Sequence, residues 1–130
     1  MNIKSIRISA LVAMMLGAGA LYAAPKAIAQ LDVYRQQGIE QADPVRGKQL
    51  WYSVSNQRSC TNCHGESPRS VGKHVKTGKP IEPMAPSLNP ERFQSEKDVE
   101  KWFLRNCKWT FGRECSTQEK ADILTWLSGQ

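Results

Sequence analysis

The chain has 130 residues, with 18 lysines and arginines against 12 acidic residues, a formal net charge of +6. Lys4, Arg7 and Lys26 lie near the N-terminus, and without them fifteen cations face twelve acids, a charge of +3. This size allows one domain with a modest core. The weak charge and the lack of a recognisable reading helix argue against nucleic acid as a partner.

The first 29 residues have the features of a signal peptide. Two cations precede an apolar run over residues 8–24, which is short for a membrane-spanning helix, and residues 27–29 (AIA) form a small-x-small cleavage site. We therefore predict cleavage after Ala29, a mature domain of residues 30–130 and a periplasmic location. An uncleaved membrane anchor is the alternative, although no second charged cluster or aromatic belt flanks the run.

Two helices are predicted before residue 60. Residues 31–41 (LDVYRQQGIEQ) are expected to form about two helical turns, which Gly38 weakens. Asp43 as the N-cap and Pro44 at the first helical position then begin a helix over residues 44–54. This second helix would turn Leu50 and Trp51 toward one side.

Residues 60–64 (CTNCH) have the spacing of a c-type haem attachment site. Two intervening residues let both thiols bond one edge of a porphyrin, and the histidine then ligates the iron. A thioredoxin-like motif would need a strand before it, and a zinc site would need ligands besides His74. The motif therefore predicts one covalent haem c, held by Cys60, Cys63 and His64. A buried porphyrin would also enlarge a core that is thin for about 100 residues.

A long loop follows the motif, and we expect no strand in the mature chain. Its basic stretch fits either a solvated loop or a docking patch for an acidic partner. The stretch consists of Arg69, Lys73, Lys76 and Lys79. Met84, in IEPMAPS, is the usual type of second axial ligand in an electron-carrying cytochrome c, because a thioether favours Fe(II). His74 would instead give a bis-histidine haem.

Two capped helices complete the chain. Ser95 as the N-cap and Asp98 at the third helical position begin the first of them. Its apolar stripe consists of Val99, Trp102 and Phe103. Ser116 and Glu119 form a capping box for the last helix, which Gly129 ends.

This order of elements resembles the class I cytochrome c fold. In that fold a glycine and an aromatic residue of the N-terminal helix cross the C-terminal helix. Gly47 and Trp51, against Leu124 and Trp126, fit such a crossing. We therefore expect an all-α, class I cytochrome c-like fold around one covalently attached haem.

The second cysteine pair lies in RNCKWTFGREC (105–115), which we expect to be the loop before the last helix. A bridge between Cys107 and Cys115 would close a nine-residue ring and stabilise the fold by roughly 2.5 kcal/mol in the chain-entropy model. Class I cytochromes take the distal ligand from the last loop, which favours Asn106 over Met84. Lys108 or a free Cys107 thiolate would be rarer ligands. These residues alone leave open whether Asn106 binds iron or only bonds the backbone of a stapled loop.

The run KWFLRNCKWTFGRECSTQEKADILTWLSGQ, with CTNCHG, TGKPIEPMAPS and NPERF, resembles the sphaeroides haem protein (SHP) type of cytochrome c. The resemblance spans residues 43–130. It implies axial ligation by His64 and Asn106, with a Cys107–Cys115 disulfide beside the asparagine. It also implies that the asparagine leaves on reduction, so that ferrous haem binds O2, NO or similar molecules, and that Met84 packs against the haem. Trp102, Phe103, Trp109 or Phe111 would be candidates for the wall of the open site, with ordinary core packing as the alternative role of each.

Three functions fit these observations. The first is a periplasmic gas-binding cytochrome, for which the resemblance implies a dihaem cytochrome c as electron donor, linked to a membrane b-type cytochrome. Reduction of oxygen or of a nitrogen oxide is one use of such a site, and the sequence leaves enzyme activity open. The second is an electron-transfer cytochrome c ligated by His64 and Met84. The third is a redox sensor or disulfide-exchange protein that uses Cys107 and Cys115.

Overall fold

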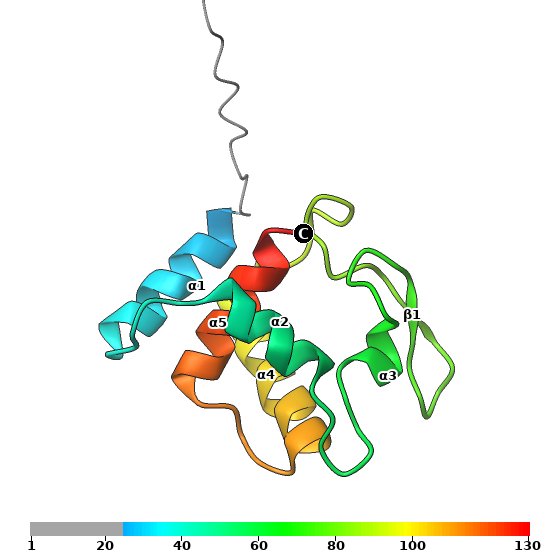
Figure 1. The fold of residues 1–130 in the computed structure, drawn as a ribbon. Coiled ribbons are helices and arrows are strands. Elements are labelled where there is room, and N and C mark those ends of the chain that lie inside the picture. Colours follow the sequence, from blue (N-terminus) through cyan, green and yellow to red (C-terminus); the bar gives the residue numbers. More distant parts are fainter. Residues whose placement is uncertain (1–24) are drawn as a thin grey trace, which may run out of the picture.

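The computed structural model describes residues 25–130, in which five helices and one short hairpin follow one another (Figure 1). The elements are α1 (Pro25–Gln36), α2 (Pro44–Tyr52), α3 (Thr61–His64), β1 (Gly72–Lys73), β2 (Pro80–Ile81), α4 (Glu96–Phe111) and α5 (Thr117–Ser128). The helices dominate, as predicted. The antiparallel β1–β2 pair corrects the expectation that no strand would form. Two-residue strands are too short to show an alternating pattern in the sequence.

Most of the predicted signal peptide lies outside the described residues. Its last five residues begin α1, where Ala27 is fully buried. The N-terminal helix therefore starts before the predicted residue 31, and it ends at Gln36, two residues before Gly38 adopts a φ of +85°. No helix among residues 25–130 is both long enough and apolar enough to cross a membrane.

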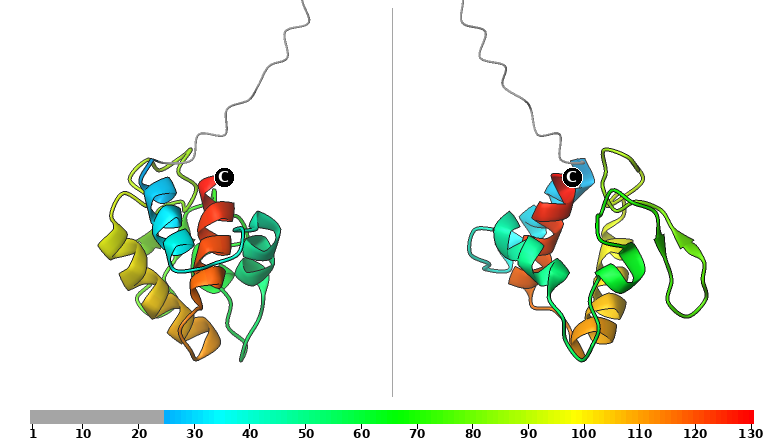
Figure 2. Two further views of the ribbon diagram at one scale, coloured as in Figure 1. Left: turned by 90° about the vertical axis from the view of Figure 1, so that its left-hand side faces the viewer. Right: turned by 45° about the vertical axis from the view of Figure 1, so that its right-hand side comes forward.

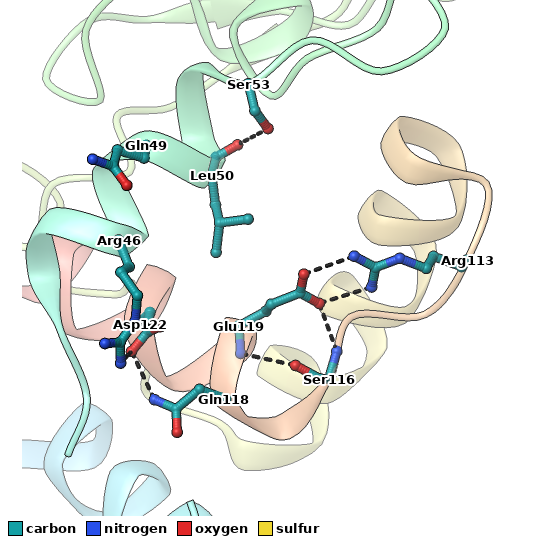
Figure 3. Close-up of a pocket in the computed structure, with 9 residues that line it drawn as sticks. All are labelled: Arg46, Gln49, Leu50, Ser53, Arg113, Ser116, Gln118, Glu119 and Asp122. Carbon is teal, nitrogen blue, oxygen red and sulfur yellow. Dashed lines mark hydrogen bonds and ion pairs between the residues drawn. The ribbon is translucent and has the colours of Figure 1, made fainter. Parts of the chain in front are cut away.

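Polar caps determine where α2, α4 and α5 begin, and all three predicted caps are confirmed. The carboxylate of Asp43 accepts from the backbone N–H of Val45, and the Ser95 hydroxyl accepts from that of Asp98. Ser116 and Glu119 form the capping box of α5 in both directions, at 3.2 and 2.8 Å (Figure 3). Each such cap stabilises its helix by about 1 kcal/mol.

The crossing of α2 and α5 confirms the predicted close approach. Gly47 is buried at the crossing, and a Cβ there would overlap the backbone carbonyl of Asp122. One turn later the rings of Trp51 and Trp126 lie 5.5 Å apart between centroids. Leu124, which we expected at the same contact, instead packs beneath α1.

The core consists of two clusters on opposite sides of α5. The first lies under α1 and comprises Ala27, Leu31, Tyr34, Ala121 and Leu124. The second lies under α2 and comprises Trp51, Ile123, Trp126 and Leu127. Phe103 of α4 packs against both clusters, so that α4 and α5 together join α1 to α2.

A buried carboxylate reinforces the crossing of α2 and α5. Asp122 accepts from the backbone N–H of Asp43 at 2.7 Å. It also accepts from Arg46 at 2.8 Å and from Gln118 at 2.9 Å (Figure 3). Burial alone would raise the pKa of Asp122, but these donors more than offset it and leave the pKa below its ordinary value. The start of α2 is thereby tied to the middle of α5.

Candidate haem site

The CTNCH segment forms a single helical turn. Cys60 precedes α3, and the N–H of His64 donates to the Cys60 carbonyl at 3.1 Å. The Asn62 side chain accepts from the N–H of Ser59 at 2.6 Å and holds the entry to the turn. Residues three apart share one side of a helix, so Cys60 and Cys63 present both thiols to the same side. Neither thiol is in a disulfide.

The His64 imidazole is mostly buried beside Trp51, with ring centroids 5.1 Å apart. Its Nδ1 is enclosed without a hydrogen-bond partner among residues 25–130, and Nε2 makes no hydrogen bond to them either. Burial, assisted by the cation of Arg92, lowers the pKa of His64 to about 4. The ring is therefore neutral near pH 7, the state in which an imidazole nitrogen can ligate a metal.

The C-terminal half of α4 lies against the motif. Burial raises the pKa of the Cys60 thiol to about 11, and a hydrogen bond with Thr110 of α4 partly offsets this rise. Arg58 donates to the carbonyl of Trp109 at 3.0 Å, and its guanidinium lies 5.1 Å from the centroid of that indole ring. The chain that enters the motif is thus fixed to the end of α4.

Asn106 lies on this same helix, which corrects the prediction that it belongs to a loop. The α4 helix continues through Phe111 and ends at Gly112, whose φ of +72° is the left-handed conformation that glycine favours. A disulfide joins Cys107 in the last turns of α4 to Cys115 just before α5, with the Cα atoms 5.6 Å apart. The Asn106 side chain is exposed and makes no hydrogen bond to residues 25–130.

The surroundings of the other candidate ligands differ. Met84 is half-buried and packs against the cluster around Trp51 and Trp126, and its N–H donates to the Pro68 carbonyl at 2.8 Å. The Nδ1 of His74 accepts from two backbone N–H groups within the hairpin, those of residues 76 and 77. Lys108 forms an exposed ion pair with Glu114 at 3.1 Å.

Arg92 is a site residue that the sequence reasoning did not identify. Its guanidinium donates to the carbonyl of Pro83 at 2.8 Å and also to that of Glu82. It is half-buried, has no ion pair within residues 25–130, and burial lowers its pKa. The only signal in the sequence is its position in NPERF, since the nearness of Arg92 to His64 depends on the tertiary fold.

A surface hollow between α2 and the start of α5 is separate from this site (Figure 3). It is lined by Arg46, Gln49, Leu50, Ser53, Arg113, Ser116, Gln118, Glu119 and Asp122. None of the predicted haem or iron ligands is among these residues. Two of the aromatic residues predicted beside the open haem site differ in their surroundings. Phe103 packs in the core, whereas Trp102 is 50% exposed.

The crossing of α2 and α5, the CxxCH turn between them and the returning α4 define a c-type cytochrome of class I type. Residues 37–127 match the family described as "Domain of unknown function (DUF1924)". The cytochrome c-type protein SHP of Cereibacter sphaeroides is 45% identical over 94 residues, which cover 68% of this chain and 72% of that protein. The chain belongs to this family and is an SHP-type cytochrome c.

Further relatives agree with this assignment. Cytochrome c'' of Methylophilus methylotrophus is 39% identical over 71 residues, 55% of this chain and 49% of that protein. The structure of oxidised SHP, described as an oxygen-binding cytochrome c, superposes with a TM-score of 0.74 at 39% identity, over 80% of this chain and 96% of that one. Oxidised cytochrome c'' gives 0.67 at 29% identity, over 78% and 92%. The fold is therefore the predicted cytochrome c fold, and its cofactor is a covalently bound haem c.

Proposed function

We propose that this chain is an exported monohaem cytochrome c that binds a small diatomic molecule, O2 or NO, at its reduced haem. Cys60 and Cys63 would hold the haem through two thioether bonds, and His64 would ligate its iron. Asn106 would be the second ligand of the ferric iron and would be lost on reduction. The haem supplies an iron that accepts one electron and can bind such a ligand.

The position of Asn106 on α4 is the observation that carries this proposal. Thr110 contacts the Cys60 thiol, and residues four apart lie above one another on a helix. Asn106 therefore lies on the side of α4 that faces the attachment turn, with a carboxamide that no residue among 25–130 engages. A neutral amide oxygen is a hard, weak donor, which suits ferric iron better than ferrous iron.

The Cys107–Cys115 disulfide supports a weak ligand. It joins the residue after Asn106 to the chain that enters α5, and both cysteines are buried. A weak bond to iron cannot order a flexible segment, so the backbone must hold the carboxamide in place. The relatives are consistent with this role. SHP is described as oxygen-binding, and the solution structure of cytochrome c'' is described as giving insights into haem-ligand detachment.

Other residues of the site hold the cofactor and determine its environment. Arg92 is a half-buried cation without a carboxylate partner among residues 25–130, close to His64. Its positive charge would suit a haem propionate, which is an anion. The electrons come from redox partner proteins, for which a dihaem cytochrome c and a membrane b-type cytochrome are our proposal. The mature cytochrome acts in the periplasm, after cleavage of the signal peptide has removed residues 1–29.

An electron-transfer cytochrome c with His64 and Met84 as ligands is the second candidate. The observation in its favour is that Met84 packs in the same cluster as Trp51, which lies against His64. The two candidates differ in what reduction does. A methionine-ligated haem stays closed to added gases, whereas loss of the asparagine opens the ferrous haem.

The test compares Asn106→Ala with Met84→Leu in the haem-loaded protein. We expect Asn106→Ala to convert the ferric optical spectrum from low-spin to high-spin and Met84→Leu to leave it unchanged. The reduced wild type should be high-spin and should shift on addition of CO or NO. A ferric spectrum that survives Asn106→Ala but is lost in Met84→Leu, with a reduced form inert to both gases, would establish the second candidate instead.

A further inference from the structure

The β1–β2 hairpin packs directly on the haem-attachment turn. Gly72 of β1 is buried, and a Cβ there would lie 2.8 Å from the Cα of His64 and would overlap the Cys63 carbonyl. Only a glycine allows the two backbones to approach so closely. Figure 2 shows the hairpin at the periphery of the molecule, alongside α3. Whatever binds the hairpin therefore lies next to the haem motif.

The hairpin concentrates positive charge. Residues 67–81 contain four cations and no acid, and Glu66 and Glu82 are the acids that flank this segment. The four cations are Arg69, Lys73, Lys76 and Lys79, all of them exposed, and no salt bridge within residues 25–130 engages any of them. The rest of the predicted mature chain has eleven cations and twelve acids, a net charge of −1. The hairpin and the residues that lead into it thus carry the positive charge of an otherwise nearly neutral chain.

Exposed apolar side chains accompany these cations. Val71, directly before β1, is 60% exposed, and Val75, in the turn between β1 and β2, is 50% exposed. Apolar contacts with a charged rim are typical of small, transient protein interfaces, in which the charges steer the approach and the apolar contacts seat the partner. A lysine cluster that served only solubility would not need to be anchored on the attachment turn.

We propose that the hairpin is the docking surface for an acidic redox protein that donates electrons to the haem. This inference rests on the proposed attachment of the haem to Cys60, Cys63 and His64. The partner's acidic surface is drawn to the lysines, and its redox centre is placed beside the attachment turn. One electron then passes from the partner, which is oxidised, to the ferric iron, which becomes ferrous. No bond forms or breaks at the docking surface.

The experiment measures reduction of the ferric haem-loaded protein by stopped flow, with reduced flavodoxin as an acidic one-electron donor. The test variant carries Lys73→Gln, Lys76→Gln and Lys79→Gln. The control variant loses the same charge at Lys48, Lys97 and Lys101, which are exposed on α2 and α4. At low salt we expect about a tenfold slower reduction for the test variant and less than about a twofold change for the control. Added salt should remove the difference.

Equal slowing of both variants would overturn the proposal, because only net charge would then matter. An unchanged rate would also overturn it, including the case in which the test variant loses binding to phosphatidylglycerol vesicles, since the hairpin would then bind a membrane surface. Gas-binding spectra of both variants distinguish this inference from the proposed function. The spectra of both variants should match that of the wild type. A wild type that binds no gas would refute the role of Asn106, but the difference in reduction rate between the two variants would remain.

Discussion

The close crossing of α2 and α5 predicts that Gly47→Ala destabilises the protein. In an open helix this change would stabilise by about 0.8–1 kcal/mol. Here the new methyl group would lie 2.9 Å from the backbone N of Ile123 and would overlap the Asp122 carbonyl. Backbone atoms cannot rotate away as a side chain can, so the two helices must separate, and this loosens the packing of the Trp51 cluster. Overpacking costs about 1–3 kcal/mol, and the clash with backbone places this cost near the upper end, so after the gain in helix propensity we expect a net loss of about 1–2 kcal/mol.

Urea unfolding of the haem-loaded protein, followed by circular dichroism, measures this loss. For a domain of about 100 residues this loss corresponds to a fall in Tm of roughly 5–15 °C. Gly129→Ala is the matched control, because a Cβ there would meet its nearest atom at an ordinary 3.6 Å. It should change stability by less than about 0.5 kcal/mol. A more stable Gly47→Ala variant would refute the close helix crossing, since only helix propensity would then operate.

Three further changes test the parts of the site and its support. Asp122→Asn should lower stability at neutral pH by about 2 kcal/mol and flatten the acid limb of the stability curve. The depressed pKa of Asp122 stabilises the fold above 3.8, and this stability is lost as pH falls through the lower folded value. Replacing both Cys107 and Cys115 with alanine should lower the free energy of unfolding by roughly 2.5 kcal/mol. The optical spectrum of the ferric haem should become partly high-spin. An unchanged spectrum would show that the disulfide does not hold Asn106 in place. Arg92→Gln should lower the midpoint potential in a spectroelectrochemical titration, because a cation near the haem favours the ferrous state, and a rise would contradict its placement.

Local signals in the sequence predicted most of the helical frame. Asp43, Ser95 and Ser116 each satisfy backbone donors within three residues, so their caps do not depend on the rest of the fold. The crossing at Gly47 and Trp51 was predictable by resemblance to cytochromes c. Of the two residues of α5 predicted at this crossing, Trp126 is confirmed. Leu124 was wrong, because α1 covers the side of α5 that carries it. A helix of twelve residues with a weak apolar pattern gave no sign that it would share this core.

The site was predictable where covalent spacing governs it and less so where packing does. The CxxCH spacing identified the haem motif without any knowledge of the fold. The extension of α4 through Asn106 was missed, because Gly112 and the cysteine pair suggested a loop while the helix in fact continues to the glycine. Arg92, Thr110 and Gly72 approach the motif only through tertiary contacts, which no local pattern encodes.

The predicted cleavage after Ala29 has a consequence that α1 makes measurable. It would remove the first five residues of the helix, including the fully buried Ala27, and leave Gln30 as the first residue. The rest of α1 would stay attached through Tyr34, whose hydroxyl donates to Glu100 of α4.

Loss of the buried methyl and of one helical turn should make a chain that begins at Gln30 less stable, by about 1–2 kcal/mol, than one that begins at Pro25. Urea unfolding of the two haem-loaded chains measures this difference, and equal midpoints would show that residues 25–29 do not pack as described. Intact-mass analysis of the exported protein determines the cut itself. A mature chain that begins at Pro25 would overturn cleavage after Ala29 and would show that export preserves the whole of α1.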